Sequence, residues 1–297
     1  MKKLSFAFVI LAGVLWGTSG LFVQLLAPYG FTTLQISAVR GGVSFVAVAL
    51  FALLFDRSLF RVRWWELLLC LFIGVALFGT GNCYFYALQL TSISTAVVLM
   101  YTEPALVMLF SVLFLKEKIT PLKLVSLCTM LFGCVLVSGI LGDFKPNPVG
   151  ILIGLLSGVS FAAYNILTKI AVDKGMRPLS VTLYGFLFAS SLSLALSNPV
   201  ELVRTAASAL GATLPLLVAI GLVSFVAPYL LYTMAMRALP VGTVSALGIV
   251  EPMAATVFGI LFLKEHLTVL SAVGIAAILL AVVLLGLAEN KATEKTK

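Results

Sequence analysis

"TEPALVMLFSVLFLKEKIT" (Thr102–Thr120) and "VEPMAATVFGILFLKEHLT" (Val250–Thr268) are two copies of one pattern. Each copy places a glutamate before a proline inside an apolar stretch, at Glu103 and at Glu251, and each then reaches Phe-Leu-Lys-Glu. The two glutamates are 148 residues apart (251 minus 103), and at this offset ten of the twenty positions from Glu103 to Leu122 are identical. Chance similarity between apolar segments would not align Glu-Pro, Lys-Glu and Thr in one register. The sequence therefore contains an internal repeat.

The composition indicates that the repeat lies in a membrane. Of the 297 residues, 62% are hydrophobic and only 10% are charged, whereas soluble domains carry about 25% charged residues. Apolar runs of about 20 residues can cross a bilayer as helices, and the apolar residues do not alternate with polar ones as in a β-barrel. The predicted fold class is an all-α integral membrane protein with ten transmembrane helices, near 4–26, 31–54, 65–88, 92–115, 121–140, 149–171, 179–197, 211–236, 241–263 and 267–287.

Five spans in each copy make the second copy enter the membrane from the opposite side, because five is odd. The prediction is a five-plus-five inverted-topology repeat, a plan that transporters commonly use. We expect a first repeat over 1–141, an outer loop over 142–150, a second repeat over 151–288 and a polar tail over 289–297. The segment "MKKLSFAFVILAGVLWGTSG" resembles a signal peptide, but its long apolar run lacks a small-residue cleavage site, which favours a retained first span.

The net charge of +8 follows from the loops and needs no nucleic-acid partner. With the N-terminus in the cytoplasm, fifteen of the nineteen Lys and Arg residues fall in inner segments and three in outer ones, and Arg40 lies within a span. Cytoplasmic loops of membrane proteins carry such an excess of positive charge. The sequence therefore predicts a multi-pass protein of the cell membrane with both termini in the cytoplasm.

The carboxyl groups of Glu103 and Glu251 fall near the middle of their spans. An acidic side chain there costs on the order of 3 kcal/mol, and such residues are candidates for function by default. Pro104 and Pro252 each remove one helical hydrogen bond, so we expect a break in the helix beside each acid. The alternative is a protonated glutamate that only packs helices together, since burial disfavours the charged form.

Other polar residues within the spans have two interpretations each. Tyr84 and Tyr232 match at the offset of 148, which indicates either a shared cavity lining or the tyrosines typical of membrane interfaces. Arg40 either extends toward the membrane surface or pairs with an acid or an anionic solute. Glu117 and Glu265 are interpreted as interfacial pairs or anchors at the ends of spans.

Ten spans in two halves, Trp16-Gly17 in the first span, and "LKEKIT" and "LKEHLT" closing spans four and nine resemble the drug/metabolite transporter superfamily, and most closely its EamA-type members. The resemblance implies transport of small organic solutes across the cytoplasmic membrane, often export of amino acids, through a central cavity. The family often has Gly-Glu-Arg where this chain has Lys116-Glu117-Lys118 and Lys264-Glu265-His266, so those flanks are left out of the site. The substrate-binding candidates that the resemblance implies are Trp16, Asn82, Tyr84, Tyr101, Glu103, Tyr232 and Glu251.

The predicted function is a secondary transporter that works by alternating access, with Glu103 or Glu251 carrying a proton. No phosphate-binding loop for ATP is present, and no cofactor or metal site is predicted. The expected partners are a small-molecule solute and the lipid bilayer, and the sequence carries no signal for the oligomeric state. The alternatives are a uniporter or exchanger of metabolites, a channel, and an intramembrane serine hydrolase built on Ser19 of "GTSG" with His266, the single histidine.

Overall fold

A computed structural model describes residues 2–117, 119–142, 147–263 and 266–294, and this part of the chain contains helices and no β-strand. Ten of its stretches are long and apolar enough to cross a membrane, at the ten places that the sequence predicts. The predicted all-α membrane fold is confirmed. The elements are α1 (Lys2–Gly17), α2 (Ser19–Leu26), η1 (Ala27–Tyr29), α3 (Thr33–Phe55), η2 (Arg57–Phe60), α4 (Trp64–Leu90), α5 (Ile93–Met100), α6 (Glu103–Leu115), α7 (Pro121–Ser138), α8 (Pro148–Asp173), α9 (Pro178–Leu196), α10 (Pro199–Ser208), α11 (Leu210–Gly221), η3 (Leu222–Val226), α12 (Ala227–Ala235), α13 (Val241–Gly248), α14 (Val250–Leu263) and α15 (Val269–Glu294).

Local sequence sets where many of these helices begin. Pro121, Pro148 and Pro199 each open a helix, a position where the missing N–H of proline costs nothing. The residue before each proline caps the helix through its side-chain oxygen; for α8 this is Asn147, which accepts from the N–H of Gly150 at 3.0 Å. The predicted outer loop over 142–150 therefore ends earlier, at Asn147.

Spans four and nine are broken beside the two repeated glutamates. In span four, α5 ends at Met100 and α6 begins at Glu103, with Pro104 in its first turn. In span nine, α13 ends at Gly248 and α14 begins at Val250. The interruptions lie where proline removes a helical hydrogen bond, as the sequence predicts. Each acid is therefore held at a helix end.

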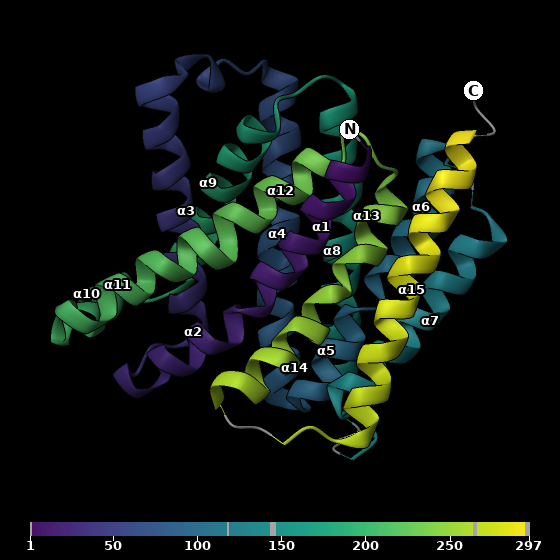
Figure 1. Ribbon diagram of the computed structural model, residues 1–297. Coiled ribbons are helices and arrows are strands. Elements are labelled where there is room, and N and C mark those ends of the chain that lie inside the picture. Colours follow the sequence, from purple (N-terminus) through teal and green to yellow (C-terminus); the bar gives the residue numbers. More distant parts are fainter. Residues whose placement is uncertain (1, 118, 143–146, 264–265, 295–297) are drawn as a thin grey trace.

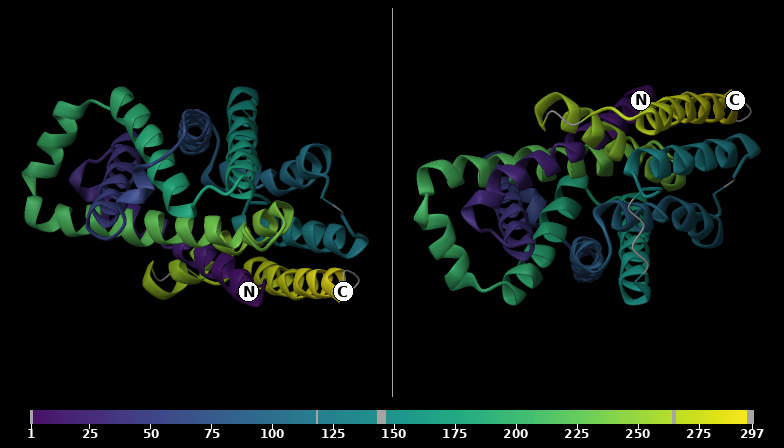
Figure 2. Two further views of the ribbon diagram at one scale, coloured as in Figure 1. Left: turned by 90° about the horizontal axis from the view of Figure 1, so that it is seen from above. Right: turned by 90° about the horizontal axis from the view of Figure 1, so that it is seen from below.

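The two halves interleave in one bundle. Helix α7 of the first half packs along α15 of the second, α4 packs along α8, and α1 contacts both α12 and α14. Figure 2 shows α7 beside α15 in both views along the bundle. At their crossing a Cβ on Gly133 would lie 2.8 Å from the carbonyl oxygen of Gly274, so only glycine allows this approach.

Helix α1 begins and helix α15 ends at the same end of the bundle (Figure 1), as an even number of spans requires. Below, this is called the terminal end, and the other is called the remote end. Helix α15 continues to Glu294, into the segment predicted as a polar tail, because Glu289 is buried and paired. Lys264 and Glu265 of the second repeat lie outside the described residues.

Candidate functional site

A cavity of about 930 Å³ lies between the two halves, within the range of sites for small molecules. Its walls come from α1, α2, α3, α4, α5, α7, α8, η3, α12 and α14. It extends to Leu88 near the end of α4, to Ser92 before α5 and to Ser138 at the end of α7. These positions all lie at the remote end, so the cavity opens away from the chain termini.

Glu251 lies in this cavity, because α14 begins one residue before it. The buried Tyr101 side chain lies with its hydroxyl beside the carboxyl group of Glu251. Arg40 is the cation that interacts with Glu251. A carboxyl group, a guanidinium and a phenol hydroxyl therefore line one cavity, where electrostatic interactions are stronger than in water.

Arg40 enters the cavity from α3 and is poorly satisfied by the protein. Its Nη2 donates one long hydrogen bond, of 3.4 Å, to Ser37 Oγ, and its Nε is buried without a partner among the described residues. The guanidinium lies over the rings of Phe225, at 4.6 Å, and Phe85, at 5.8 Å, within the range of cation–π contacts. A guanidinium carries five N–H donors, so several remain for a ligand. Arg40 thus faces the cavity and Glu251, and does not extend to the membrane surface.

Aromatic rings form the wall next to these charges. The Trp16 ring lies 5.0 Å from the rings of Tyr229 and Tyr232, and Phe161 lies 6.3 Å away. Such edge-on and tilted pairs hold rigid side chains in place. Rigid aromatic walls with a few polar groups are typical of pockets for small organic molecules.

Glu103 has a different environment from Glu251. Its side chain is 1% exposed and does not line the cavity. Its Oε1 accepts hydrogen bonds from Asn165 Nδ2 and from Ser245 Oγ, both at 2.6 Å. Both donors belong to the second half, on α8 and α13, so Glu103 joins the halves through a polar cluster.

The structure divides the seven predicted residues into two groups. The first group lines the cavity, and the second lies behind its wall. The cavity is also lined by three residues that are missing from the predicted set, Arg40, Phe225 and Tyr229. A cation within a span is a candidate for function, so the sequence could have indicated Arg40. Nothing in the sequence distinguishes Phe225 from the many other apolar residues of the spans. The lining group is Trp16, Tyr84, Tyr101 and Glu251, and the group behind the wall is Asn82, Glu103 and Tyr232.

Glu117 closes the terminal end of the bundle. It accepts backbone N–H groups of Val241 at 2.8 Å and Gly242 at 3.4 Å. These are the first residues of α13, whose N-cap residue Pro240 provides no side-chain cap. A carboxylate at a helix N-terminus is stabilising, so Glu117 of the first half caps a helix of the second.

A buried ion pair joins the halves at the same end. Lys123 Nζ lies 2.5 Å from Glu289 Oε1, and both side chains are less than a tenth exposed. The same oxygen accepts from Thr243 Oγ1 at 2.5 Å. The cavity is therefore sealed by polar contacts toward the chain termini while its remote end is open.

Two inverted five-helix repeats around a central cavity that contains charges of both signs are the architecture of a membrane transporter. The sequence profile of the EamA-like transporter family matches residues 3–139 and matches again over 148–287. The chain therefore belongs to the EamA-like transporter family, as the sequence resemblance indicates. The two matches confirm the repeat, and membership places the chain among transporters and not among enzymes such as the serine hydrolase considered above.

Curated relatives agree with this family, and a solved structure shares the fold. The chain is 27% identical to "Uncharacterized transporter YwfM" of Bacillus subtilis (strain 168), over 96% of this chain and 94% of that protein. It is 29% identical to "Threonine/homoserine exporter RhtA" of Salmonella typhimurium (strain LT2), over 71% of this chain and 68% of that protein. A crystal structure that is 20% identical matches 97% of this chain and 98% of its own with a TM-score of 0.78, which shows that the fold is shared.

Proposed function

We propose that the protein exports small zwitterionic metabolites, with amino acids as the first candidates, across the cytoplasmic membrane by alternating access. The observation that carries this proposal is that Arg40 and Glu251 line the same aromatic cavity. A guanidinium matches the geometry of a carboxylate, and a glutamate binds an ammonium group. A solute with both groups would satisfy both side chains, whereas a solute with one would leave the other charge unpaired, which is costly when buried.

The relative RhtA supports amino acids as the solute class, because its name gives threonine and homoserine as what it exports. The aromatic wall of Trp16 and Tyr229 is compatible with a compact organic solute. L-Threonine is therefore the first probe to use.

For energy coupling, Glu251 is the better placed of the two acids that the sequence singles out. It faces the cavity, where a proton and an ammonium group would compete for the same carboxylate. Glu103 is enclosed by Asn165 and Ser245, so it is kept as the second candidate. If a proton and the solute cannot bind Glu251 at the same time, a proton that enters from outside displaces the solute, and the transporter exchanges one for the other. A uniporter or exchanger without protons is the alternative.

The open end together with the charge bias of the loops indicates which side of the membrane the cavity faces. With both termini in the cytoplasm, the remote end faces outward, so the cavity is open to the outside. For an exporter, this is the conformation that releases solute. The polar contacts of Glu117 and of Lys123 then lie on the cytoplasmic side.

The test is L-threonine counterflow in proteoliposomes, with and without a pH gradient, for the wild type, Glu251→Gln and Glu103→Gln. Loss of a charge-assisted hydrogen bond is worth about 1.5–3 kcal/mol, so Glu251→Gln should raise the threonine KM by at least about tenfold. The same variant should lose the response to the gradient.

Glu103→Gln is the matched control, because it makes the same chemical change at the repeat-related position outside the cavity. It should keep both counterflow and the gradient response. Equal behaviour of all three proteins would overturn the role of Glu251. Coupling lost only in Glu103→Gln would assign the proton to Glu103. No counterflow by the wild type for any amino acid would overturn the solute class.

A further inference from the structure

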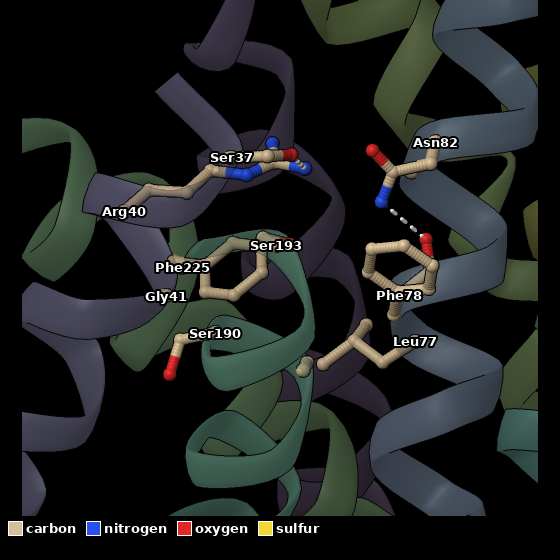
Figure 3. Close-up of a pocket in the computed structure, with 11 residues that line it drawn as sticks. Ser37, Arg40, Gly41, Leu77, Phe78, Asn82, Ser190, Ser193 and Phe225 are labelled. Atoms are coloured by element: carbon tan, nitrogen blue, oxygen red, sulfur yellow. Dashed lines mark hydrogen bonds between the residues drawn. The ribbon is translucent and has the colours of Figure 1, made fainter. Parts of the chain in front are cut away.

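A second, much smaller cavity lies behind Arg40, outside the main one. It has a volume of about 20 Å³ and lies between α3, α4 and α9. Figure 3 shows the Arg40 side chain reaching across the upper part of this pocket toward Asn82 on the facing helix. Ser37, Ser193 and Phe225 complete the wall. A space of this size holds one water molecule if enough polar groups face it.

The Asn82 side chain has a defined orientation in this pocket. Its Nδ2 donates to the carbonyl oxygen of Phe78 at 2.8 Å. That bond requires the nitrogen at this position, so the other amide atom must be the oxygen. The oxygen, Oδ1, lies on the side of the amide that faces Arg40 in Figure 3 and is buried without a partner among the described residues. An unpartnered buried acceptor is costly, so a donor belongs there.

Arg40 contributes the complementary group. Its Nε is a buried donor without a partner among the described residues, and it belongs to a side chain that lines the same pocket as Asn82. A water molecule can accept from Nε and donate to Oδ1 at once. An anion would leave Oδ1 unpaired, and a cation would be repelled by the guanidinium. The Ser193 hydroxyl, which also lines the pocket, can supply a third contact.

The pair of Arg40 and Asn82 occurs in one half of the repeat only, although the second half also lines the pocket through α9 and Phe225. At the offset of 148, Arg40 corresponds to Phe188 (40 plus 148) and Asn82 corresponds to Leu230 (82 plus 148). The second half therefore folds with apolar residues at both positions. The polar pair is thus not needed to build a five-helix repeat, and its presence beside the charged cavity points to the solute site.

We propose that one water molecule occupies this pocket, and that Asn82 is a positioning residue that acts through it on Arg40. The proposal rests on the proposed function, in which Arg40 binds the carboxylate of the solute. The guanidinium has few other contacts to fix it: one hydrogen bond of 3.4 Å to Ser37 and the faces of Phe225 and Phe85. Gly81 leaves it space, because a Cβ there would lie 3.3 Å from Nη2.

The first test is structural and does not depend on the solute. A structure of the full chain, at a resolution that shows ordered water, should have density within hydrogen-bond distance of both Asn82 Oδ1 and Arg40 Nε. In Asn82→Ala this density should be lost and the guanidinium should move. A pocket without density in the wild type, or an unchanged Arg40 in the variant, would overturn the proposal.

The second test measures L-threonine counterflow and its inhibition by L-threonine methyl ester. The ester lacks the carboxylate, so its inhibition reports binding that does not use the carboxylate contact with Arg40. Asn82→Ala should raise the threonine KM by about tenfold, as expected for a weakened bond to a charged group, with kcat within about twofold. Asn82→Asp should raise it further, because its carboxylate would pair with Arg40 directly. Inhibition by the ester should be the same in all variants.

Cys83→Ala, at the neighbouring position on α4, is the matched control and should leave both ligands unaffected. If threonine and its ester weaken equally in Asn82→Ala, the effect is general and the positioning role is wrong. If the wild type moves no amino acid, the proposed function fails, and the structural test alone then decides whether Asn82 positions Arg40.

Discussion

At the scale of single residues, Asp56 and Arg177 tie the loop after α3 to the start of α9, outside the membrane-spanning segments. The Arg177 guanidinium donates to the Asp56 carboxylate, and Ser58 also donates to it. The hydrogen bond from Arg177, followed by that from Ser58, lowers the pKa of Asp56 from 3.8 to about 2. Because the pKa in the folded state is depressed, the tie stabilises the protein above the unfolded pKa and is lost as the pH falls toward 2.

We therefore expect Asp56→Asn to unfold at a lower temperature than the wild type at neutral pH, by a small amount, since the pair is partly exposed. Thermal unfolding of the detergent-purified protein between pH 7 and pH 2.5 measures the difference in Tm. It should be constant above about pH 5 and shrink below it, as the pH falls through the unfolded and then toward the folded pKa. Arg177→Gln should give the same profile, and the double variant should be no worse than either. Additive losses would show that the pair does not interact.

The two repeated glutamates show what a residue pattern can predict. Both were predicted as buried acids at a helix break, and both lie at a helix end. Their different environments were not predictable from the motif, because the partners of Glu103 are remote in sequence. Asn165 is 62 residues away and Ser245 is 142. Only the packing of the halves decides which glutamate is enclosed and which faces the cavity.

At the scale of elements, the spans follow from apolar length and the breaks in spans four and nine follow from proline. The break between α1 and α2 has no such signal. Thr18 makes it through contacts with Leu15 O at 2.6 Å and with Ser224 Oγ at 2.7 Å. Ser224 lies in the π-helical turn η3, which also lines the cavity. These features arise from tertiary contacts between the halves, so local sequence does not predict them.

Gly17 and Gly20 give a test of how α1 and α2 pack, because both glycines line the cavity. A Cβ on Gly17 would lie 2.8 Å from Ala254 Cβ and 2.8 Å from the backbone nitrogen of Ala255, whereas nothing lies within 4 Å of one on Gly20. Gly17→Ala should therefore push α1 away from α14 and destabilise the protein by about 1–3 kcal/mol, the usual cost of overpacking. Gly20→Ala is the control and should unfold like the wild type in a thermal assay. A tolerated Gly17→Ala would mean that the two helices separate readily.

At the scale of the whole molecule, the two ends of the bundle differ although the repeat relates them. At the terminal end α13 packs against α6. The offset of 148 relates this pair to α5 and α14, which lie on facing walls of the cavity. The structure thus holds one end closed and the other open. Under the proposed alternating access, the second conformation closes α5 onto α14 and separates α13 from α6.

A cross-link across the closed end tests this exchange. A Cβ on Gly242 would lie 3.2 Å from Met108 Cγ, close enough for a disulfide after small adjustments. In a chain whose four native cysteines are replaced, Met108→Cys/Gly242→Cys should therefore oxidise readily. Oxidation should stop L-threonine counterflow, and reduction should restore it, because the link keeps α13 on α6. Each single cysteine variant should be indifferent to oxidant.

The repeat gives the matching experiment for the other conformation. The offset relates Met108 to Thr256 and Gly242 to Ser94, and Thr256 lines the open cavity. Ser94→Cys/Thr256→Cys should cross-link faster when solute drives the cycle than without solute, because alternating access closes that end only in the alternate conformation. Full counterflow by the oxidised Met108→Cys/Gly242→Cys protein would mean that the terminal end does not open during transport. The inverted repeat would then determine the fold, but the two ends of the bundle would not exchange conformations as the repeat predicts.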